Sequence, residues 1–345
     1  MLDLVIYIGR FQPFHSGHQQ VLDIALRKAR HVLVLAGSAN KARNIRNPFT
    51  ANERRAMILE CVRPEDRQRV AVSPLGDWLY VEERWLIEVQ RLVAEHVQLL
   101  GLTDSARIGV IGHLKDASSY YLEMFPQWEL VDVPQFQALD ATALRSLYFG
   151  STGQGDWMRL AASVPAPVLD FLRSFAGSSF YEHMRREFDF VRDYKAAWQA
   201  APYPPTFVTV DCVVVHSGHV LLVKRAGDPG HGLWALPGGF LDQKETLESA
   251  ALRELKEETR VKLPLPVLRG AIKAQRMFDH PERSLRGRTL TQAFYLHFPS
   301  GELPPVKGGD DAKAARWIPL ADLVDMEREF FEDHFEIIQY FLGTN

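Results

Sequence analysis

The sequence predicts two α/β domains, the first built on a parallel sheet and the second on a mixed sheet. In the first half, short β-rich runs alternate with helical stretches, the order that gives parallel strands joined by crossover helices. The proline-rich segment 201–205 then interrupts regular structure. The second half opens on a hairpin pattern over 206–224, which indicates a sheet of a different kind.

Length and composition agree with two globular domains. The chain has 345 residues, of which 46% are hydrophobic and 24% charged, and a chain of this length usually has more than one core. The formal net charge of −3 gives no reason to expect a nucleic acid or a membrane as partner. Cys61 and Cys212 lie far apart and form no disulfide framework or zinc signature, so we expect a cytoplasmic protein.

The elements follow from hydrophobic periodicity and capping signals. In the first half we expect strands at 4–8, 32–36, 70–72 and 108–111 and helices at 17–29, from Thr50 onward and at 81–98. Thr50 with Glu53 three residues later is a capping box. In the second half we expect strands at 206–215, 220–224 and 289–298 and a helix at about 246–259. The expected domains are 1–183 and 206–345, joined by a helical and proline-rich linker at 184–205.

The segment GRFQPFHSGH, residues 9–18, joins the first strand to the first helix. A helix N-terminus is a natural seat for phosphate, and His15 and His18 can donate hydrogen bonds to phosphoryl oxygens. For an isolated HxxH pattern, a metal pair or plain loop residues would be commoner. In this context the segment resembles the (H/T)xGH signature of the nucleotidyltransferase superfamily. The resemblance implies a Rossmann-like domain, with catalytic His15 and His18 and a nucleotide-binding loop at Gly9, Arg10 and Phe11.

Two further stretches resemble the NMN adenylyltransferase branch of that superfamily. In SANKARNIRNPFTANER, residues 38–54, the candidate contacts to ATP or NMN are Arg43, Arg46, Asn47 and Arg54. In DWLYVEERW, residues 77–85, Asp77 and Trp85 stand where the family recognises the carboxamide and stacks on the nicotinamide ring. An ordinary core aromatic on an amphipathic helix is the alternative for Trp85.

The stretches GHLKDASSYY, residues 112–121, and LDATALRSLYF, residues 139–149, extend this resemblance. It assigns nucleotide-binding roles to Gly112, His113, Lys115, Asp116, Thr142 and Arg145, the last two in an (S/T)xxR motif for the β- and γ-phosphates. One hydroxyl of the usual motif is missing, and a plain helix cap is the alternative. The implied reaction is in-line attack of the NMN phosphate on ATP, with Mg²⁺ and catalytic Arg145 offsetting charge.

A second motif begins at Gly239 and resembles the Nudix box at every charged position, through Glu245, Arg253, Glu254, Glu257 and Glu258. On a helix the last three carboxylates share one face, where they repel unless a cation such as Mg²⁺ or Mn²⁺ lies among them. A solvated acidic face is the commoner origin of such a run, but it does not explain the fixed offsets. We expect Glu245 to pair with Arg253 and so fix the loop against the helix. The resemblance implies an α/β/α domain in which these three glutamates hold metal and Glu258 is catalytic.

The stretch RMFDHPERSLRGRTLTQAF, residues 276–294, resembles Nudix domains fused to NMN adenylyltransferases, which hydrolyse ADP-ribose to AMP and ribose 5-phosphate. Arg286 and Arg288 are its candidate phosphate or ribose contacts. The expected partners are ATP, NMN and ADP-ribose, with a homo-oligomer left open. Two alternatives remain: an adenylyltransferase for a pantetheine or flavin precursor with a general Nudix hydrolase, or a Nudix half that only senses a ligand.

Overall fold

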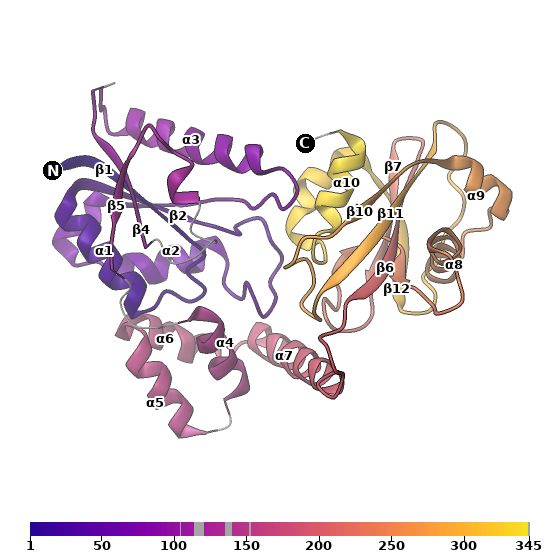
Figure 1. Ribbon diagram of the computed structural model, residues 1–345, viewed down its shortest axis with the longest axis horizontal. Helices are drawn as coiled ribbons and strands as arrows, with labels where there is room; N and C mark the ends of the chain where they lie inside the picture. The colour runs from indigo at the N-terminus through magenta and orange to yellow at the C-terminus, as the bar shows by residue number, and fades with distance from the viewer. Residues whose placement is uncertain (104, 114–120, 135–139, 152, 344–345) are drawn as a thin grey trace. The chain divides into compact units, whose positions relative to one another are not determined.

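The computed structural model describes residues 1–103, 105–113, 121–134, 140–151 and 153–343 (Figure 1). The chain divides into two compact units, Met1–Arg185 and Arg186–Asn345. Helix α7, Ser179–Ala197, runs across this division and occupies much of the segment for which we predicted a linker. In the part of the chain that the structure describes, no helix is long and apolar enough to span a membrane.

The first unit contains a five-stranded parallel sheet in the order β3-β2-β1-β4-β5. The strands are β1 Leu2–Gly9, β2 Ala29–Ala36, β3 Val70–Pro74, β4 Ile108–Gly112 and β5 Glu129–Asp132. The order reverses between β1 and β4, and open α/β sheets bind ligands at the carboxyl ends of the strands beside such a reversal. The segment after β1 carries GRFQPFHSGH, so the topology places this motif at that edge.

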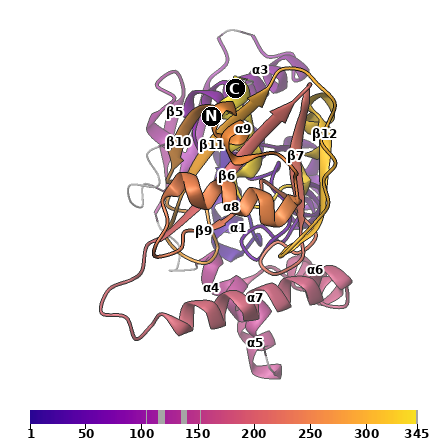
Figure 2. The same cartoon turned by 90° about the vertical axis from the view of Figure 1, so that its right-hand side faces the viewer.

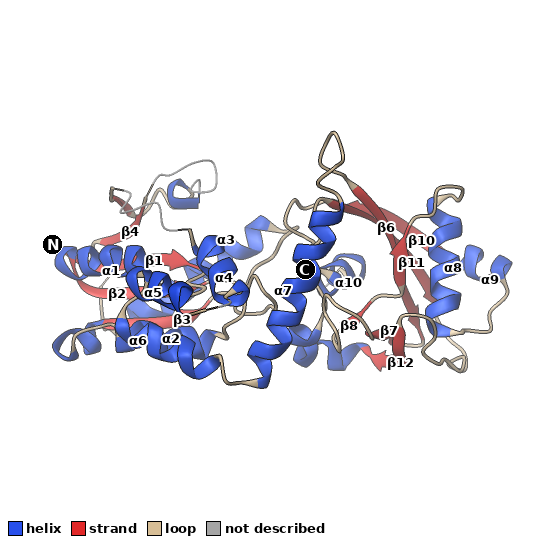
Figure 3. Cartoon of the chain, turned by 90° about the horizontal axis from the view of Figure 1, so that it is seen from below, coloured by secondary structure: helices blue, strands red, loops and turns tan. Residues whose placement is uncertain are grey.

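Helices cover both faces of this sheet (Figures 1 and 3). The helices on the sheet are α1 Ser16–Lys28, α2 Ala51–Glu60 and α3 Glu82–Leu99, and a 3-10 helix, η1, spans Pro64–Arg69. The helices α4 Ala141–Gly150, α5 Gln154–Ser163 and α6 Ala166–Phe175 pack on one another beside the sheet, and α6 also packs on α2. Alternate residues of a strand point to opposite faces. Leu4, Ile6 and Ile8 of β1 accordingly share one buried cluster with Val89 and Val93 of α3.

The second unit contains a mixed seven-stranded sheet with the path β10-β11-β6-β7-β12, to which β8 and β9 add at β7 and β6. The strands are β6 Phe207–His216, β7 His219–Arg225, β8 Trp234–Ala235, β9 Gly238–Phe240, β10 Ile272–Phe278, β11 Thr289–Phe298 and β12 Ala312–Pro319. The helices are α8 Leu247–Thr259, α9 Leu265–Ala271 and α10 His334–Leu342, with the 3-10 helix η3 at Leu320–Glu329. Strand β6 pairs parallel with β11 and antiparallel with β7. In Figure 2, α8 and α9 lie over one face of this sheet.

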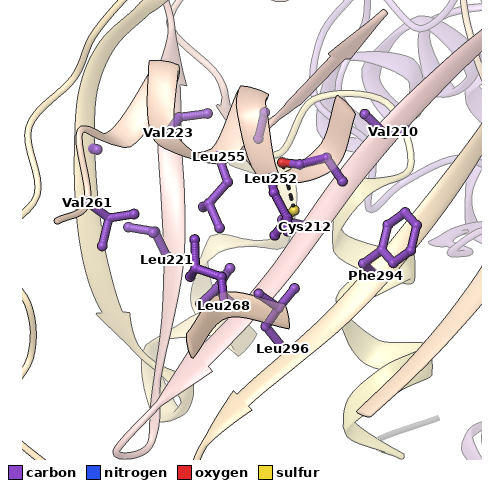
Figure 4. Close-up of a cluster of buried hydrophobic side chains, with 14 of the residues drawn as sticks. Val210, Cys212, Leu221, Val223, Leu252, Leu255, Val261, Leu268, Phe294 and Leu296 are labelled. Atoms are coloured by element: carbon purple, nitrogen blue, oxygen red, sulfur yellow. Dashed lines mark hydrogen bonds between the residues drawn. The ribbon is translucent and has the colours of Figure 1, made fainter. Parts of the chain in front are cut away.

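The core of the second unit forms between α8 and this sheet (Figure 4). Leu252 and Leu255 of α8 pack against Val210 and Cys212 of β6. The Cys212 thiol donates to the carbonyl of Ala251 at 3.3 Å, and burial raises the pKa of the thiol. Cys212 therefore serves packing.

The predicted fold class, a Rossmann-like parallel sheet followed by a mixed α/β unit, is confirmed. The predicted capping box at Thr50 is also confirmed, since the Thr50 side chain accepts from the backbone of Glu53 and the Glu53 carboxylate accepts from the backbone of Thr50. The sequence analysis did not predict the strands β5, β8, β9, β10 and β12 or the helices α9 and α10. The shortest of these elements carry little periodic signal.

Candidate active sites

His15 and His18 cap the first turn of α1 reciprocally. The backbone N–H of His18 donates to Nδ1 of His15, and the backbone N–H of His15 donates to Nδ1 of His18, both at 3.3 Å. The two rings stack with centroids 3.6 Å apart. Because each Nδ1 accepts a hydrogen bond, each neutral ring carries its proton on Nε2. The helix N-terminus therefore presents two fixed Nε2–H donors.

Both histidines are neutral near pH 7. Burial lowers the pKa of His15 to about 4, although Asp140 acts in the opposite direction. Burial also lowers the pKa of His18 well below its ordinary value, and His15 lowers it further. The pair therefore stabilises negative charge as hydrogen-bond donors, together with the positive end of the helix dipole.

Arg145 connects α4 to the histidine loop. Its Nη1 donates to the carbonyl of Gln12 at 2.8 Å and its Nη2 to Oγ1 of Thr142 at 3.2 Å. The cap of α4 is Asp140, whose carboxylate accepts from the backbone N–H of Thr142 at 2.9 Å. The structure thus brings Thr142 and Arg145 to the loop that carries His15 and His18.

Two arginines of the 38–54 stretch have structural partners. Arg54 is fully buried, and its Nη1 donates to the carbonyls of Arg10 at 2.6 Å and Gly37 at 2.5 Å. The prediction that Arg54 meets a phosphate is therefore wrong. Arg43 forms two hydrogen bonds with the carboxylate of Glu53, both at 2.8 Å, and its contact with a nucleotide stays a prediction. A sequence motif identifies an arginine but does not show in which direction its guanidinium points.

Asn47 fits the contact predicted for it. It is 9% exposed, and among the described residues its Oδ1 is a buried oxygen without a hydrogen-bond partner. Such an atom is costly unless a ligand or water bonds to it. The half-buried Arg46 lies beside it in the chain. Both contacts stay predictions.

Asp77 ties together two loops at the carboxyl edge of the sheet. Its carboxylate accepts from the backbone N–H of Ser38 at 3.1 Å and from the Ser38 hydroxyl at 2.5 Å. Its own N–H donates to Oδ1 of Asn40 at 2.9 Å. Trp85 is half-buried and meets Tyr121 edge-on with ring centroids 6.0 Å apart. This packing agrees with the core alternative for Trp85 and leaves part of the ring accessible.

The remaining residues predicted for this site differ in their burial and contacts. Phe11 is 1% exposed and packs edge-on against Tyr7, so its ring belongs to the core. A side chain at Gly9 would lie 2.9 Å from the Phe11 ring, which explains the glycine. Gly112 ends β4, and Nδ1 of His113 bonds to the carbonyl of Val133 at 2.9 Å. Lys115 and Asp116 lie outside the described residues.

The Nudix-like motif borders a pocket of about 280 Å³. Its lining comprises Thr209, Asp211, Arg225, Gly238, Gly239, Phe240, Asp242, Arg253, Glu254, Glu258, Arg283, Arg286, Asp310, Asp311, Phe331, Glu332 and His334. The N–H of Gly238 donates to the Glu258 carboxylate at 2.9 Å. A Cβ at Gly239 would lie 2.4 Å from Oε1 of Glu254, so only glycine lets the backbone come this close.

Arg253 organises the acidic residues of the motif. It bonds Glu245 at 2.6 Å, Glu254 at 2.9 Å and Glu257 at 3.0 Å. The predicted pairing of Glu245 with Arg253 is confirmed. After the helix, Arg260 adopts a left-handed conformation with φ of 51° at the position where the motif usually has glycine. The departure from the motif therefore affects the end of the helix and not the pocket.

The carboxylates at the pocket suit a divalent cation. Burial raises the pKa of Glu258 to about 8, with the Gly238 hydrogen bond acting against this, and burial also raises the pKa of Glu254. A nearby cation favours the ionised form of both groups. Among the described residues no three His, Cys, Asp or Glu side chains form a ready metal-ligand set. Two carboxylates with waters and substrate phosphates are nevertheless a common set for Mg²⁺.

Comparison with known proteins decides the family. A cytidylyltransferase-like family model matches residues 6–76 and a NUDIX domain model matches residues 205–341. The chain is 35% identical over 187 residues to the nicotinamide/nicotinic acid mononucleotide adenylyltransferase of Acinetobacter baylyi, covering 54% of this chain and 93% of that protein. It is 37% identical over 135 residues to the ADP-ribose pyrophosphatase of Methanocaldococcus jannaschii, covering 39% of this chain and 72% of that protein.

A solved structure matches both units together. It is a bifunctional NMN adenylyltransferase/ADP ribose pyrophosphatase from Francisella tularensis, complexed with AMP and a manganese ion. The TM-score is 0.91 at 34% identity, and the match covers 100% of this chain and 99% of that chain. The chain belongs to this bifunctional family. The family predicted from the two motifs is thus confirmed.

Some residues that line the pocket belong to neither sequence motif and were not predicted. Asp211 is 4% exposed inside the apolar strand β6 and accepts from the Thr291 hydroxyl at 2.5 Å. A lone charge in an otherwise apolar strand was the available signal. Arg283 forms a fully buried ion pair with Asp333 at 2.9 Å. The two residues are far apart in the sequence, so local spacing does not predict this pair.

Of the two arginines predicted to contact the substrate, only Arg286 is among the residues that line the pocket. Arg286 lines the pocket, with its guanidinium 4.9 Å from the Phe240 ring centroid. Arg288 is exposed and donates to the carbonyl of Asp279. Glu257, unlike Glu254 and Glu258, is not among the lining residues. The structure therefore favours Arg286, Glu254 and Glu258 as the residues that meet ligand or metal.

Proposed function

We propose that the first unit transfers AMP from ATP to NMN, giving NAD and pyrophosphate, and that the second unit hydrolyses ADP-ribose to AMP and ribose 5-phosphate. The observation that carries the proposal is the pair of Nε2–H donors of His15 and His18 at the start of α1. The printed activities of the Acinetobacter, Methanocaldococcus and Francisella relatives support both halves. We place both reactions in the cytoplasm, in keeping with free thiols at Cys61 and Cys212.

In the first unit the phosphate of NMN is already an anion, so its in-line attack on the α-phosphorus of ATP needs no general base. The chain contributes positioning and charge stabilisation. His15 and His18 would donate to phosphoryl oxygens, and Arg145, which α4 holds against the carbonyl of Gln12, would add positive charge beside them. The loop is held in place by the buried side-chain amide of Gln12, whose Nε2 donates to the carbonyl of Phe49 at 2.9 Å and whose Oε1 accepts from the N–H of Phe49 at 3.0 Å.

In the second unit Glu254 and Glu258 would hold Mg²⁺, or Mn²⁺ as in the Francisella structure, with Glu257 at the outer side. When bound, the metal supplies an activated water and neutralises phosphate charge. The Gly238 N–H holds the Glu258 carboxylate toward the pocket at 2.9 Å. Arg225 and Arg286 line the same pocket and can meet the diphosphate of the substrate.

Phosphorus NMR of the purified protein tests both halves. With ATP, NMN and Mg²⁺ we expect NAD and pyrophosphate to appear together, and with ADP-ribose we expect AMP and ribose 5-phosphate. His18→Ala should abolish only the first reaction and Glu258→Gln only the second, so each variant is the folding control of the other. Product formation from nicotinic acid mononucleotide but not NMN would overturn the proposed acceptor.

A further inference from the structure

Helix α7 contributes a buried acid to the second unit. Glu187 lies just past the division between the two units and is 1% exposed. Its Oε1 accepts a hydrogen bond from the backbone N–H of Gly230 at 3.1 Å. A glutamate is rarely this buried unless it is paired. Glu187 lies outside the 205–341 segment that matches the NUDIX domain model.

The residues around Gly230 form a tight turn between β7 and β8. Gly230 has a φ of 82°, and a Cβ there would lie 2.2 Å from the Phe331 ring. The N–H of Gly232 donates to the carbonyl of Arg225, and the N–H of Leu233 donates to the carbonyl of Gly230, both at 3.0 Å. The backbone of this turn is therefore fixed at one end by Phe331 and at the other by β7, with Glu187 bonding its apex.

The same turn holds an arginine at the pocket. The carbonyl of Pro229, adjacent to Gly230, accepts from Nε of Arg225 at 3.0 Å. The Arg225 guanidinium lies over the Phe331 ring, with Cζ 4.1 Å from the centroid. Arg225, Phe331 and Glu258 all line the pocket. With Nε and one face of the guanidinium occupied, the two terminal amino groups bond no other side chain or carbonyl among the described residues, and they can meet an anion.

We infer that Glu187 is a positioning residue for the pyrophosphohydrolase reaction: it fixes the turn at Gly230, and the adjacent Pro229 carbonyl thereby orients Arg225 toward the diphosphate of the substrate. This inference rests on the proposed function of the second unit. It also makes part of α7, which the sequence alone assigns to a linker, a component of the Nudix site.

The test compares Glu187→Ala with Glu187→Gln in the full chain. Losing one hydrogen bond to the turn should raise KM for ADP-ribose about tenfold, with kcat changed less than about twofold. Gln keeps an oxygen acceptor and should restore most of the loss. Adenylyl transfer should be unchanged in both variants. An unchanged KM in Glu187→Ala would overturn the inference, and so would an equal loss of adenylyl transfer, which indicates general unfolding.

A double-mutant cycle with Arg225→Ala separates positioning from general packing. If Glu187 acts through Arg225, Glu187→Ala should have little further effect on KM in the Arg225→Ala background. Additive effects would overturn the inference. Absence of ADP-ribose hydrolysis by the wild-type chain would refute the proposed function itself, and the inference would fall with it; an active wild type with an unaffected Glu187→Ala variant refutes the inference alone.

Discussion

His15 and His18 hold each other's Nδ1 atoms against the backbone, each accepting a hydrogen bond from the other's N–H at 3.3 Å. The same contacts that cap α1 thus decide which ring nitrogen faces a ligand. Capping and catalysis use different atoms of the same two side chains, and substitutions can separate them because Asn resembles the Nδ1 side of histidine and Gln the Nε2 side.

We predict that His18→Asn lowers kcat for adenylyl transfer by about 10²-fold or more, because it removes one donor to the phosphates. Its Oδ1 can still accept from the N–H of His15, so the melting temperature should change little. His18→Gln should keep more activity, because its amide nitrogen can reach the position of Nε2. Its melting temperature should also change little, because Gln at this helix position can accept from the N–H of His15 as Glu53 does from the N–H of Thr50. Steady-state kinetics and thermal melts of both variants decide this, and equal losses of activity would contradict it.

The pKa of His15 predicts a pH-dependent stability of the first unit. The folded pKa of about 4 lies below the ordinary 6.5, so the unfolded chain binds more protons and stability falls as pH drops from about 6.5 toward 4. At pH 5 the shifted pKa of His15 lowers the unfolding free energy by about 2 kcal/mol relative to neutral pH. His15→Asn keeps a cap without titrating, so calorimetry at pH 7 and pH 5 should show a smaller loss than in wild type. Parallel losses would refute the assignment.

Removing divalent metal should lower the thermal stability of the second unit selectively. If Glu254 and Glu258 bind the cation, Mg²⁺ at a hundredfold excess over Kd should stabilise the wild-type unit by about 2.7 kcal/mol. Glu258→Gln keeps the acceptor for the Gly238 N–H but loses the charge, so its melting temperature should respond little to Mg²⁺ or EDTA. Differential scanning calorimetry checks this, and an equal Mg²⁺ response in both proteins would exclude Glu258 as a ligand.

Gly239→Ala should impair ADP-ribose hydrolysis more than tenfold, because its Cβ would lie 2.4 Å from Oε1 of Glu254 and force the backbone or the carboxylate to move. Gly227→Ala is a matched control, since a Cβ at Gly227 has no heavy atom within 4 Å. Initial rates of AMP release from both variants provide the measurement. Equal activity of the two variants would show that the close approach at Gly239 is unnecessary.

The sequence predicted what depends on local spacing. The cap at Thr50, the helix carrying Glu254 and Glu258, and the pair of Glu245 with Arg253 all follow from offsets within about two helical turns. It did not predict contacts between distant segments, such as Asp211 at the pocket or Glu187 with Gly230. These depend on how strands and loops meet in space, which periodicity does not encode.

Arg54 bonds two segments that are distant in the sequence, and its motif did not predict these contacts. Its motif suggested a phosphate ligand, yet its side chain is fully buried and bonds the carbonyls of Arg10 and Gly37, which follow β1 and β2. Burial lowers its pKa to about 10, against the effects of Asp77 and Glu53, so it remains charged at pH 7. Replacing it by Met removes the donor to both of these carbonyls, at a cost of about 3 kcal/mol.

We therefore expect Arg54→Met to lower the unfolding free energy of the first unit and, through the loops that follow β1 and β2, to reduce adenylyl transfer. ADP-ribose hydrolysis by the second unit should be unaffected. The exposed neighbour Arg55 provides the control, since Arg55→Met removes the same charge without opening a buried site. If Arg54→Met retained full stability and lost only affinity for ATP, the original interpretation of Arg54 as a phosphate ligand would have to be restored.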